Sequence, residues 1–271
     1  MNSLAPSLST GSPTSTGTTH TLERALTILR AFDGSTAPLS HSEMVRRTGY
    51  SKASVSRIAF TLVSLGYLAR DADRVRFRIG LRGPSLGHTY RANSPVAALA
   101  RPILQEFADQ HDLSMALGVA DGIEILYIEY CKSPSTSTLC LAVGKRVPIE
   151  VSAIGRAYLS DQAEGDRDSL LERIASQSRT ATPHALRHTR LGLAQLRAQG
   201  YCLVAGEYHR DIWGAAVPLR LGRPGISMGL SCSGMTPEPC ESKVREVIGP
   251  ALKDTARRLQ KALAEVDSVL F

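Results

Sequence analysis

Long apolar runs are missing from this chain of 271 residues. No stretch approaches the roughly 18 uninterrupted apolar residues that a membrane-spanning helix needs. Cysteine is scarce: the five cysteines include no C-x-x-C pair and are odd in number. This usage argues against a disulfide framework and is typical of a reducing compartment. We therefore expect a cytoplasmic protein without membrane spans.

Charge is absent from residues 1–19, which are rich in Ser, Thr, Pro and Gly. This segment lacks the basic start and apolar middle of a signal peptide, and it lacks the arginines of a transit peptide. Such a composition cannot bury enough apolar surface to fold. We expect a disordered tail.

Motifs of several enzyme classes are also missing. The chain has no Gly-x-Ser-x-Gly nucleophile elbow and no Gly-x-x-x-x-Gly-Lys phosphate-binding loop. His184 and His188 have the i, i+4 spacing that can bind a metal from a helix, but the glutamate of H-E-x-x-H and an obvious third ligand are lacking. A solvated helix start is the simpler interpretation. We predict no catalytic residue, metal or cofactor, and a spatially assembled cysteine nucleophile stays open as an enzyme alternative.

Residues 39–66 have the pattern of two short helices joined by a tight turn. Ser40 and Glu43 form the S-x-x-E capping box, and Gly49 stands where the first helix would end in a left-handed residue. Ser51 has the side chain of an N-cap for the second helix. Apolar residues at three- and four-residue steps predict one buried face, made of Val55, Ile58, Leu62 and Leu65.

The opposite face of the second helix carries hydroxyls and cations near its start, namely Ser51, Lys52, Ser54, Ser56 and Arg57. DNA phosphates and base edges require such groups. A helix-turn-helix places its second helix in the major groove with the N-terminal residues on the bases. We predict that these five residues contact DNA. An ordinary helical hairpin with a solvated polar face is the alternative.

A basic strand pattern follows the two helices. Val75, Phe77 and Ile79 alternate with Arg74, Arg76 and Arg78, the period of a half-buried strand. With Leu68 on a first strand and a turn at 71–73, this pattern predicts a two-stranded wing. An amphipathic helix over 22–32 precedes the two helices. We therefore expect a winged helix-turn-helix whose Arg74 and Arg76 touch backbone phosphate.

Positive charge is concentrated in the same third of the chain. Residues 1–90 hold 11 Lys and Arg and 5 Asp and Glu, a net charge of +6, whereas the other residues hold 21 and 20. An electrostatic footprint of this kind is expected for a DNA-binding domain. A domain that binds another polyanion would carry the same charge.

The rest of the chain reads as a linker followed by an α+β domain. Residues 83–111 contain a helical pattern that starts near Pro95, and Pro102 predicts a kink or a break. This linker helix is a natural dimer contact, because two-fold operators require two-fold proteins. Strands are predicted over 114–121, 123–130, 137–143, 201–208, 214–221 and 225–234, and helices near 154–162, 167–176, 185–199 and 239–266.

The chain resembles the IclR family of bacterial transcriptional regulators over about residues 20–266. The blocks that carry the resemblance are LERALTILRAF (22–32), RRTGYSKASVSRIAFTLVSLGYL (46–68), VGKRVPIEVSAIGRAYL (143–159), TATPHALR (180–187), RAQGYCLVAGEY (197–208), AAVPLR (215–220) and LSCSG (230–234). The resemblance implies a winged helix-turn-helix over 20–82, the linker, and a GAF-like effector-binding domain over 112–271. It also implies a homodimer that often pairs into a homotetramer and that controls catabolic genes.

Family effector pockets carry over to residues of three blocks. The resemblance places at the pocket Ala153, Ile154 and Gly155, then Val204, Glu207 and Gly214, and finally Ser231 and Ser233. Backbone N–H groups at a helix start, together with two hydroxyls, can bind a carboxylate. A half-buried strand face is the alternative for the Ser-Cys-Ser segment.

Two departures from the family pattern concern the ligand. Members that bind small polar acids tend to carry an acidic residue near Val204 and Gly-x-Arg-Cys near 211–214, where this chain has Asp-Ile-Trp-Gly. We therefore predict an aromatic or other bulky organic acid, with Trp213 stacking on it and His209 or Arg210 pairing with its carboxylate. A core or dimer position is the alternative for Trp213.

The predicted function is a ligand-responsive, DNA-binding transcriptional regulator of catabolic genes. Its expected partners are a double-stranded DNA operator, a small organic acid and further copies of the chain. Ligand would bind one arrangement of the protein better and so change the DNA affinity. A DNA-binding domain fused to a small-molecule enzyme domain is the alternative.

Overall fold

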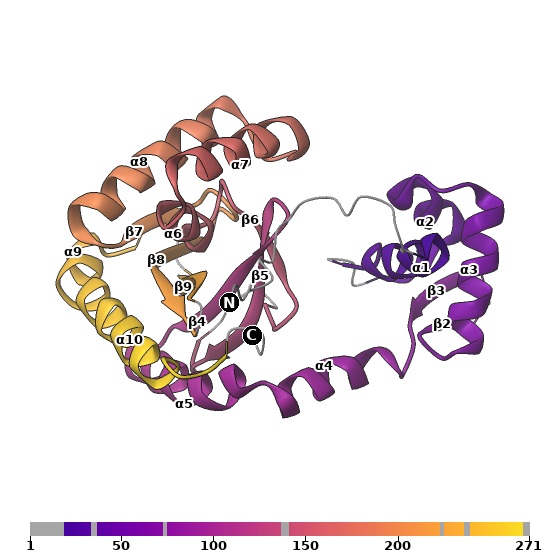
Figure 1. The fold of residues 1–271 in the computed structure, drawn as a ribbon, viewed down its shortest axis with the longest axis horizontal. Coiled ribbons are helices and arrows are strands. Elements are labelled where there is room, and N and C mark those ends of the chain that lie inside the picture. Colours follow the sequence, from indigo (N-terminus) through magenta and orange to yellow (C-terminus); the bar gives the residue numbers. More distant parts are fainter. Residues whose placement is uncertain are drawn as a thin grey trace, which may run out of the picture. The chain divides into compact units, whose positions relative to one another are not determined.

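The computed structural model describes residues 19–33, 37–72, 75–136, 141–222, 225–235 and 239–267. The chain folds into two compact units that divide between Asn93 and Ser94 (Figure 1). Of the predicted tail only Thr19 is described, and the other residues lie outside the described part. No helix within the described ranges is long and apolar enough to cross a membrane.

The first unit contains four helices and three short strands within its described residues. In chain order these are α1 (His20–Arg30), β1 (Leu39–Ser40), α2 (His41–Thr48), α3 (Lys52–Ser64), β2 (Leu68–Arg70), β3 (Arg76–Ile79) and α4 (Gly83–Asn93). The core is formed by apolar side chains of α1, α2, α3 and the strands, including Ile28, Met44, Val55, Ile58, Leu62, Leu68 and Phe77. The predicted buried face of the second helix is confirmed for Val55, Ile58 and Leu62, whereas Leu65 is exposed.

Capping side chains set the ends of α2 and α3, as predicted. The Glu43 N–H donates to Ser40 Oγ (3.2 Å), and the Ser40 N–H donates to the Glu43 carboxylate (2.7 Å). These hydrogen bonds to Ser40 lower the pKa of Glu43. Gly49 ends α2 with a φ of 72°, a backbone conformation that favours glycine. The Ser54 N–H donates to Ser51 Oγ at the start of α3 (3.3 Å).

The wing has three strands instead of the predicted two. Its order is β1-β3-β2, and Leu39 on β1 pairs with Phe77 on β3. Leu68 and Phe77 are buried as expected, but Val75 and Ile79 are exposed. The short strand before α2 was not predicted, because two residues are too few to show a period.

The second unit begins with α5 (Pro95–His111), which runs through Pro102 without the predicted break. The chain breaks instead at Ser94, whose side chain caps α5 by accepting from the Ala97 N–H (3.2 Å). Proline at position 102 removes one hydrogen bond to the carbonyl of Ala98. Ala98 is exposed, so water can serve that carbonyl.

A six-stranded antiparallel sheet forms the centre of the second unit, in the order β6-β5-β4-β9-β8-β7. The strands are β4 (Ser114–Asp121), β5 (Glu124–Lys132), β6 (Arg146–Pro148), β7 (Cys202–Ala205), β8 (Ile212–Leu221) and β9 (Ile226–Met235). The strand predicted at 137–143 is not seen: residues 137–140 lie outside the described part, and 141–143 are not in a strand. The edge strand β6 follows a few residues later.

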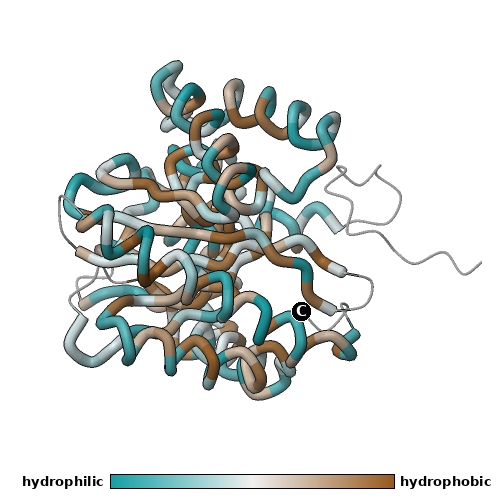
Figure 2. Tube along the Cα trace, turned by 90° about the vertical axis from the view of Figure 1, so that its left-hand side faces the viewer, coloured by the Kyte–Doolittle hydropathy of each residue, from teal (hydrophilic) through white to brown (hydrophobic). Residues whose placement is uncertain are grey.

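Helices cover both faces of this sheet (Figure 2). On one side lie α6 (Ala153–Ser160), α7 (Glu164–Gln177) and α8 (Pro183–Gln199), and on the other lie α5 and α10 (Gly249–Ala262). A three-residue helix α9 (Glu241–Lys243) and a π-helical turn η1 (Val244–Ile248) precede α10. The elements have the predicted α+β class, and the start of α6 lies against the sheet.

Candidate nucleic-acid interface and ligand pocket

The outward face of α3 combines basic, hydroxyl and apolar side chains. Lys52, Ser56 and Arg57 are exposed, as a DNA-reading face requires. The same face carries Phe60, whose side chain is 68% exposed. The predicted DNA contacts did not include Phe60. Its position opposite the buried stripe of Val55 and Ile58 is visible from the helical period.

Two of the predicted DNA contacts have a second role at the start of α3. Ser51 Oγ accepts the Ser54 N–H and donates to Ser54 Oγ (3.2 Å). Ser51 is exposed and Ser54 is partly buried. The two hydroxyls therefore hold the helix end that carries Lys52.

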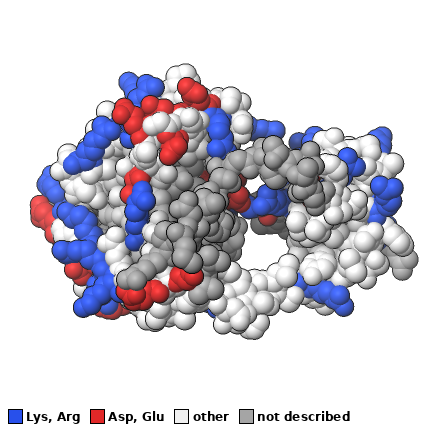
Figure 3. Space-filling model, in the orientation of Figure 1, with Lys and Arg blue, Asp and Glu red and all other residues white. Residues whose placement is uncertain are grey.

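The wing and the unit as a whole are basic. Arg76 and Arg78 are exposed on β3, and the guanidinium of Arg70 lies over the ring of Phe77 (5.1 Å to the ring centroid). Arg74 lies outside the described residues. On the face drawn in Figure 3, the unit that holds α1–α4 shows far more Lys and Arg than acidic side chains.

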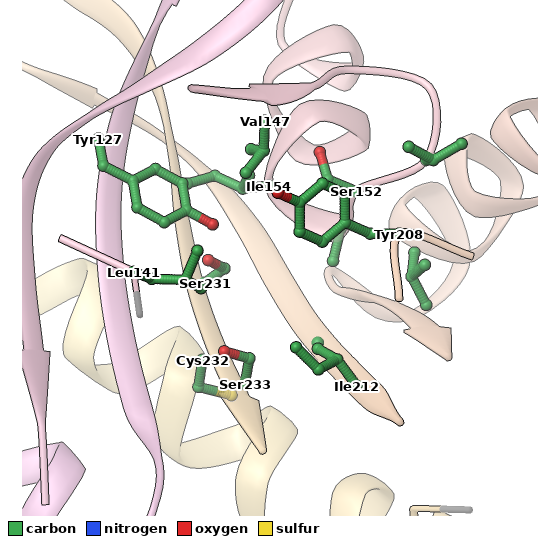
Figure 4. A pocket seen from close by; sticks show the side chains of 14 residues that line it. Tyr127, Leu141, Val147, Ser152, Ile154, Tyr208, Ile212, Ser231, Cys232 and Ser233 are labelled. Atoms are coloured by element: carbon green, nitrogen blue, oxygen red, sulfur yellow. The ribbon is translucent and has the colours of Figure 1, made fainter. Parts of the chain in front are cut away.

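A pocket lies between the sheet and the start of α6 in the second unit (Figure 4), with a cavity volume of about 50 Å³. Six of the predicted effector residues line it: Ala153, Ile154, Val204, Gly214, Ser231 and Ser233. Sequence reasoning missed several other lining residues, including Tyr127, Ser152, Tyr208 and Ile212. Tyr208 lies within the quoted block 197–208, but Tyr127 comes from β5, where no motif marks it.

Hydroxyl groups are the polar part of the pocket lining. The side chains of Tyr127 and Ser231 are hydrogen-bonded, and burial raises the pKa of Tyr127, so its phenol stays protonated. Ser233 Oγ is hydrogen-bonded to Ser114 Oγ (2.7 Å). Ser152 Oγ accepts the Gly155 N–H (3.2 Å) at the start of α6. None of the described side chains that line the pocket carries a formal charge.

Trp213 is not brought to the pocket. It lies on β8 between Ile212 and Gly214, which line the pocket, so its side chain points to the opposite face of the sheet. The indole is buried there, and a Cβ added at Gly234 would lie 2.9 Å from Trp213 Nε1. Trp213 therefore does not lie where it could stack on a ligand in this pocket, contrary to the expectation. It occupies a core position, which was the alternative.

Glu207, His209 and Gly155 lie next to the pocket without lining it. The Glu207 carboxylate is paired with Arg156 and lies 3.3 Å from His188 Nδ1. His209 and Arg210 face Asp211 within their own loop. Gly155 serves close packing, because an added Cβ would lie 2.3 Å from the Ile149 carbonyl oxygen. The described residues contain no group of three metal-binding side chains.

Two family profiles match the two units. The IclR helix-turn-helix domain matches residues 21–72, and the bacterial transcriptional regulator IclR C-terminal domain matches residues 88–261. The chain is 28% identical to the HTH-type transcriptional regulator TsaQ1/TsaQ2 of Comamonas testosteroni, over 90% of this chain and 88% of that protein. It is 28% identical to the Pca regulon regulatory protein of Pseudomonas putida, over 88% and 82% of the two chains.

Solved structures show the same architecture. The IclR family transcriptional regulator from Brucella abortus superimposes with a TM-score of 0.80 at 29% identity, covering 90% of this chain and 92% of that one. An IclR homologue from Microbacterium hydrocarbonoxydans, crystallised with 4-hydroxybenzoate, has a TM-score of 0.66 at 21% identity, covering 90% and 99%. At this low identity, the second comparison shows only that the two chains share the same fold.

A winged helix-turn-helix followed by an α+β domain with a pocket is the architecture of two-domain DNA-binding regulators. Within that class, the chain belongs to the IclR family of bacterial transcriptional regulators. Both matched domains are those of regulators, so the chain is a transcriptional regulator and not an enzyme.

Proposed function

We propose that this regulator reads a two-fold operator with the outward face of α3 and responds to an aromatic or other bulky organic acid in the pocket of the second unit. The proposal rests on two features of the same chain. The start of α3 exposes the basic residues Lys52 and Arg57, and the described lining of the pocket in the second unit is uncharged. We propose that it acts in the cytoplasm, where a DNA operator would be available to it.

The DNA half of the proposal is tested by gel shifts with Lys52→Ala and Arg57→Ala. The probe is a set of fragments that the wild-type protein selects from sheared genomic DNA. Loss of a base contact costs about 1–3 kcal/mol, and loss of a phosphate contact lowers the salt slope by about 1. Arg197→Ala, an exposed arginine on α8, is the control. Unchanged gel shifts for both α3 variants would exclude this face as the reading surface.

The wing contact is a separate part of the proposal. Arg76 on β3, and Arg74, which lies outside the described residues, are proposed to touch backbone phosphate. Arg76→Ala is expected to weaken binding to all fragments equally, since phosphate carries no sequence information. A change of preferred sequence in this variant would assign Arg76 to base reading instead.

The effector class follows from the pocket lining. Val204 stands where an acid-binding member tends to carry an acidic residue, and the remaining walls are apolar apart from hydroxyls. The backbone N–H groups of Ala153 and Ile154 at the start of α6, with Ser231, form a site for a carboxylate. One fold relative was crystallised with 4-hydroxybenzoate, which prompts the choice of probes.

Calorimetric titration with benzoate, 4-hydroxybenzoate and glyoxylate tests the effector class. We expect the two aromatic acids to bind and glyoxylate to bind more weakly. Ser231→Ala is expected to weaken the aromatic acids, whereas Ser233→Ala should do so less, because Ser233 Oγ is already hydrogen-bonded to Ser114. Binding of glyoxylate alone would overturn the aromatic class.

We also propose a homodimer, which pairs further into a tetramer. The proposed dimer contact is the linker over 83–111, which begins with α4. Helix α4 has no buried residue in the single chain, and a short helix without packing is marginal in water. Leu86 of α4 faces an apolar groove with Leu22 and Leu26 of α1 and Leu65 of α3, and all four leucines are exposed. A second copy that covers this groove supplies the missing packing.

Light scattering tests the dimer. Leu26→Asp places a charge in the groove and is expected to yield monomers or weaker dimers, whereas Leu191→Asp, an exposed leucine on α8, should leave the mass unchanged. An unchanged mass for Leu26→Asp would remove this groove from the interface.

A further inference from the structure

The pocket is too small, as it stands, for the ligands proposed above. Its cavity volume is about 50 Å³. An apolar cavity that accommodates benzene measures roughly 150 Å³. Any aromatic acid therefore requires a displacement of the pocket wall, and the structure indicates which part of the wall can move.

Two tyrosines narrow the pocket from opposite sides (Figure 4). Tyr127 belongs to β5, which is paired with β4 and β6, and its ring is buried and hydrogen-bonded to Ser231. Tyr208 is only half-buried and follows the end of β7, in the loop before β8. The sheet holds Tyr127 in place, so Tyr208 is the side that can yield.

The Tyr208 loop, residues 206–211, closes on itself through two backbone hydrogen bonds. The Gly206 N–H donates to the Ile212 carbonyl and the Ile212 N–H donates to the His209 carbonyl, both at 2.9 Å. Gly206 has a φ of 72°, which favours glycine at the first bend of the loop. These bonds close residues 206–211 into one loop at the end of the β7–β8 ladder.

One side chain ties the Tyr208 loop to the body of the unit. Glu207, next to Tyr208, pairs with Arg156 of α6, and its other oxygen lies 3.3 Å from His188 Nδ1 of α8. Arg156 Nη2 also donates to the Glu150 carbonyl (3.0 Å), beside the pocket residues Val151 and Ser152. Arg156 thus holds two segments of the pocket wall at once.

The arginine itself is confined. Its side chain is 3% exposed, and a Cβ added at Gly192 of α8 would lie 2.6 Å from Arg156 Cδ. A buried cation keeps its ion-pair partner, because an unpaired charge in this position is costly. The pairing with Glu207 is therefore a strong anchor for the loop.

We propose that Tyr208 is the gate and the size-determining residue of this pocket, and that the Glu207–Arg156–His188 contact latches it shut until a ligand displaces the ring. The inference rests on the proposed function, since it assumes that this pocket takes the effector. It identifies a specificity residue and a positioning group: Tyr208 touches the ligand, whereas Glu207 acts through the loop.

The latch is tested without any ligand by hydrogen exchange of the peptide that covers the Tyr208 loop. Glu207→Gln removes the charge that pairs with Arg156 and is expected to speed exchange of this peptide by tenfold or more. Asp211→Asn is the matched control, because Asp211 forms ion pairs with His209 and Arg210 of the same loop. Equal exchange in the wild type and in Glu207→Gln would overturn the latch. Should Glu207→Gln not fold, His188→Gln removes the other contact.

The gate is tested by ligand size. Tyr208→Ala is expected to raise the affinity for 2-naphthoate relative to benzoate by at least tenfold, while Tyr208→Phe, which keeps the ring, leaves that ratio near the wild-type value. An unchanged ratio in Tyr208→Ala would overturn the gate. If neither acid binds any of the proteins, the proposed effector class is wrong, and the exchange experiment alone decides whether the loop is latched.

Discussion

At the scale of single residues, the most consequential side chain is Arg156. It is a nearly fully buried cation, and its partner Glu207 comes from a position 51 residues away in the sequence. Burial of charge costs free energy that only pairing and hydrogen bonds offset. The pair therefore specifies how the Tyr208 loop lies on α6.

Removal of one partner should reveal that cost. Arg156→Met is expected to lower the free energy of unfolding by about 3–5 kcal/mol, because Glu207 is left without its cation. Urea unfolding of the intact protein measures it. The double variant with Glu207→Gln should lose less than the sum of the two single variants. Strict additivity would mean that the two side chains do not interact.

The cysteines give a second prediction at this scale. Burial raises the pKa of the Cys202 and Cys232 thiols to about 12, whereas hydrogen bonds to Ser242 and the backbone lower the pKa of exposed Cys240. The thiolate is the reactive form. Among these three residues, iodoacetamide at pH 8 should therefore alkylate Cys240 first, as read by peptide mass spectrometry. Cys232 lines the pocket, so equal labelling of Cys232 would show that the pocket opens widely in the absence of ligand.

At the scale of elements, close backbone packing positions α6 over the sheet. A Cβ at Gly155 would meet the Ile149 backbone at 2.3–2.4 Å, and one at Gly229 of β9 would lie 2.6 Å from the Ile154 carbonyl oxygen. Only glycine permits this approach. The start of α6 thereby reaches the pocket with Ala153 and Ile154.

Gly155→Ala is expected to destabilise the second unit by about 1–3 kcal/mol or more, because the added methyl group overpacks against backbone. Gly165→Ala on α7 is the matched control, since nothing lies within 4 Å of its added Cβ. Thermal unfolding compares the two variants. A neutral Gly155→Ala would show that α6 can shift at little cost.

At the scale of the whole molecule, the chain divides into a unit with the helix-turn-helix and a unit with the pocket. The two activities must be linked thermodynamically if the chain is ligand-responsive, and such coupling is typically about 1–3 kcal/mol, or 5–150-fold in affinity. Linkage also requires that each ligand affects the other by the same factor.

This reciprocity provides a quantitative prediction. Saturating benzoate should change the dissociation constant for the selected DNA by 5–150-fold, in the range of such couplings. Saturation with DNA should change the benzoate affinity by the same factor. Lys52→Ala should weaken DNA binding and leave benzoate binding to the free protein unchanged. Gel shifts and calorimetry measure the two constants, and unequal factors would rule out a simple two-state linkage.

Local chemistry determined much of this protein from its sequence. The capping box of Ser40 and Glu43, the left-handed end of α2 at Gly49 and the apolar stripe of α3 depend on residues within one or two turns. The turn at Asp121 and Gly122 likewise joins β4 and β5, and Asp-Gly is a strong local signal for a hairpin. Short-range patterns fix such features, so the family and the two-domain order were visible in the sequence.

Only the tertiary structure decided the composition of the pocket. Tyr127 and Tyr208 meet there because antiparallel pairing orders the strands β5-β4-β9-β8, a sequence of neighbours that no local pattern encodes. Strand alternation placed Ile212 and Gly214 in the pocket and turned Trp213 to the opposite face. The pairing of Arg156 with Glu207 was hidden for the same reason, because a contact between distant residues depends on how the sheet and helices pack.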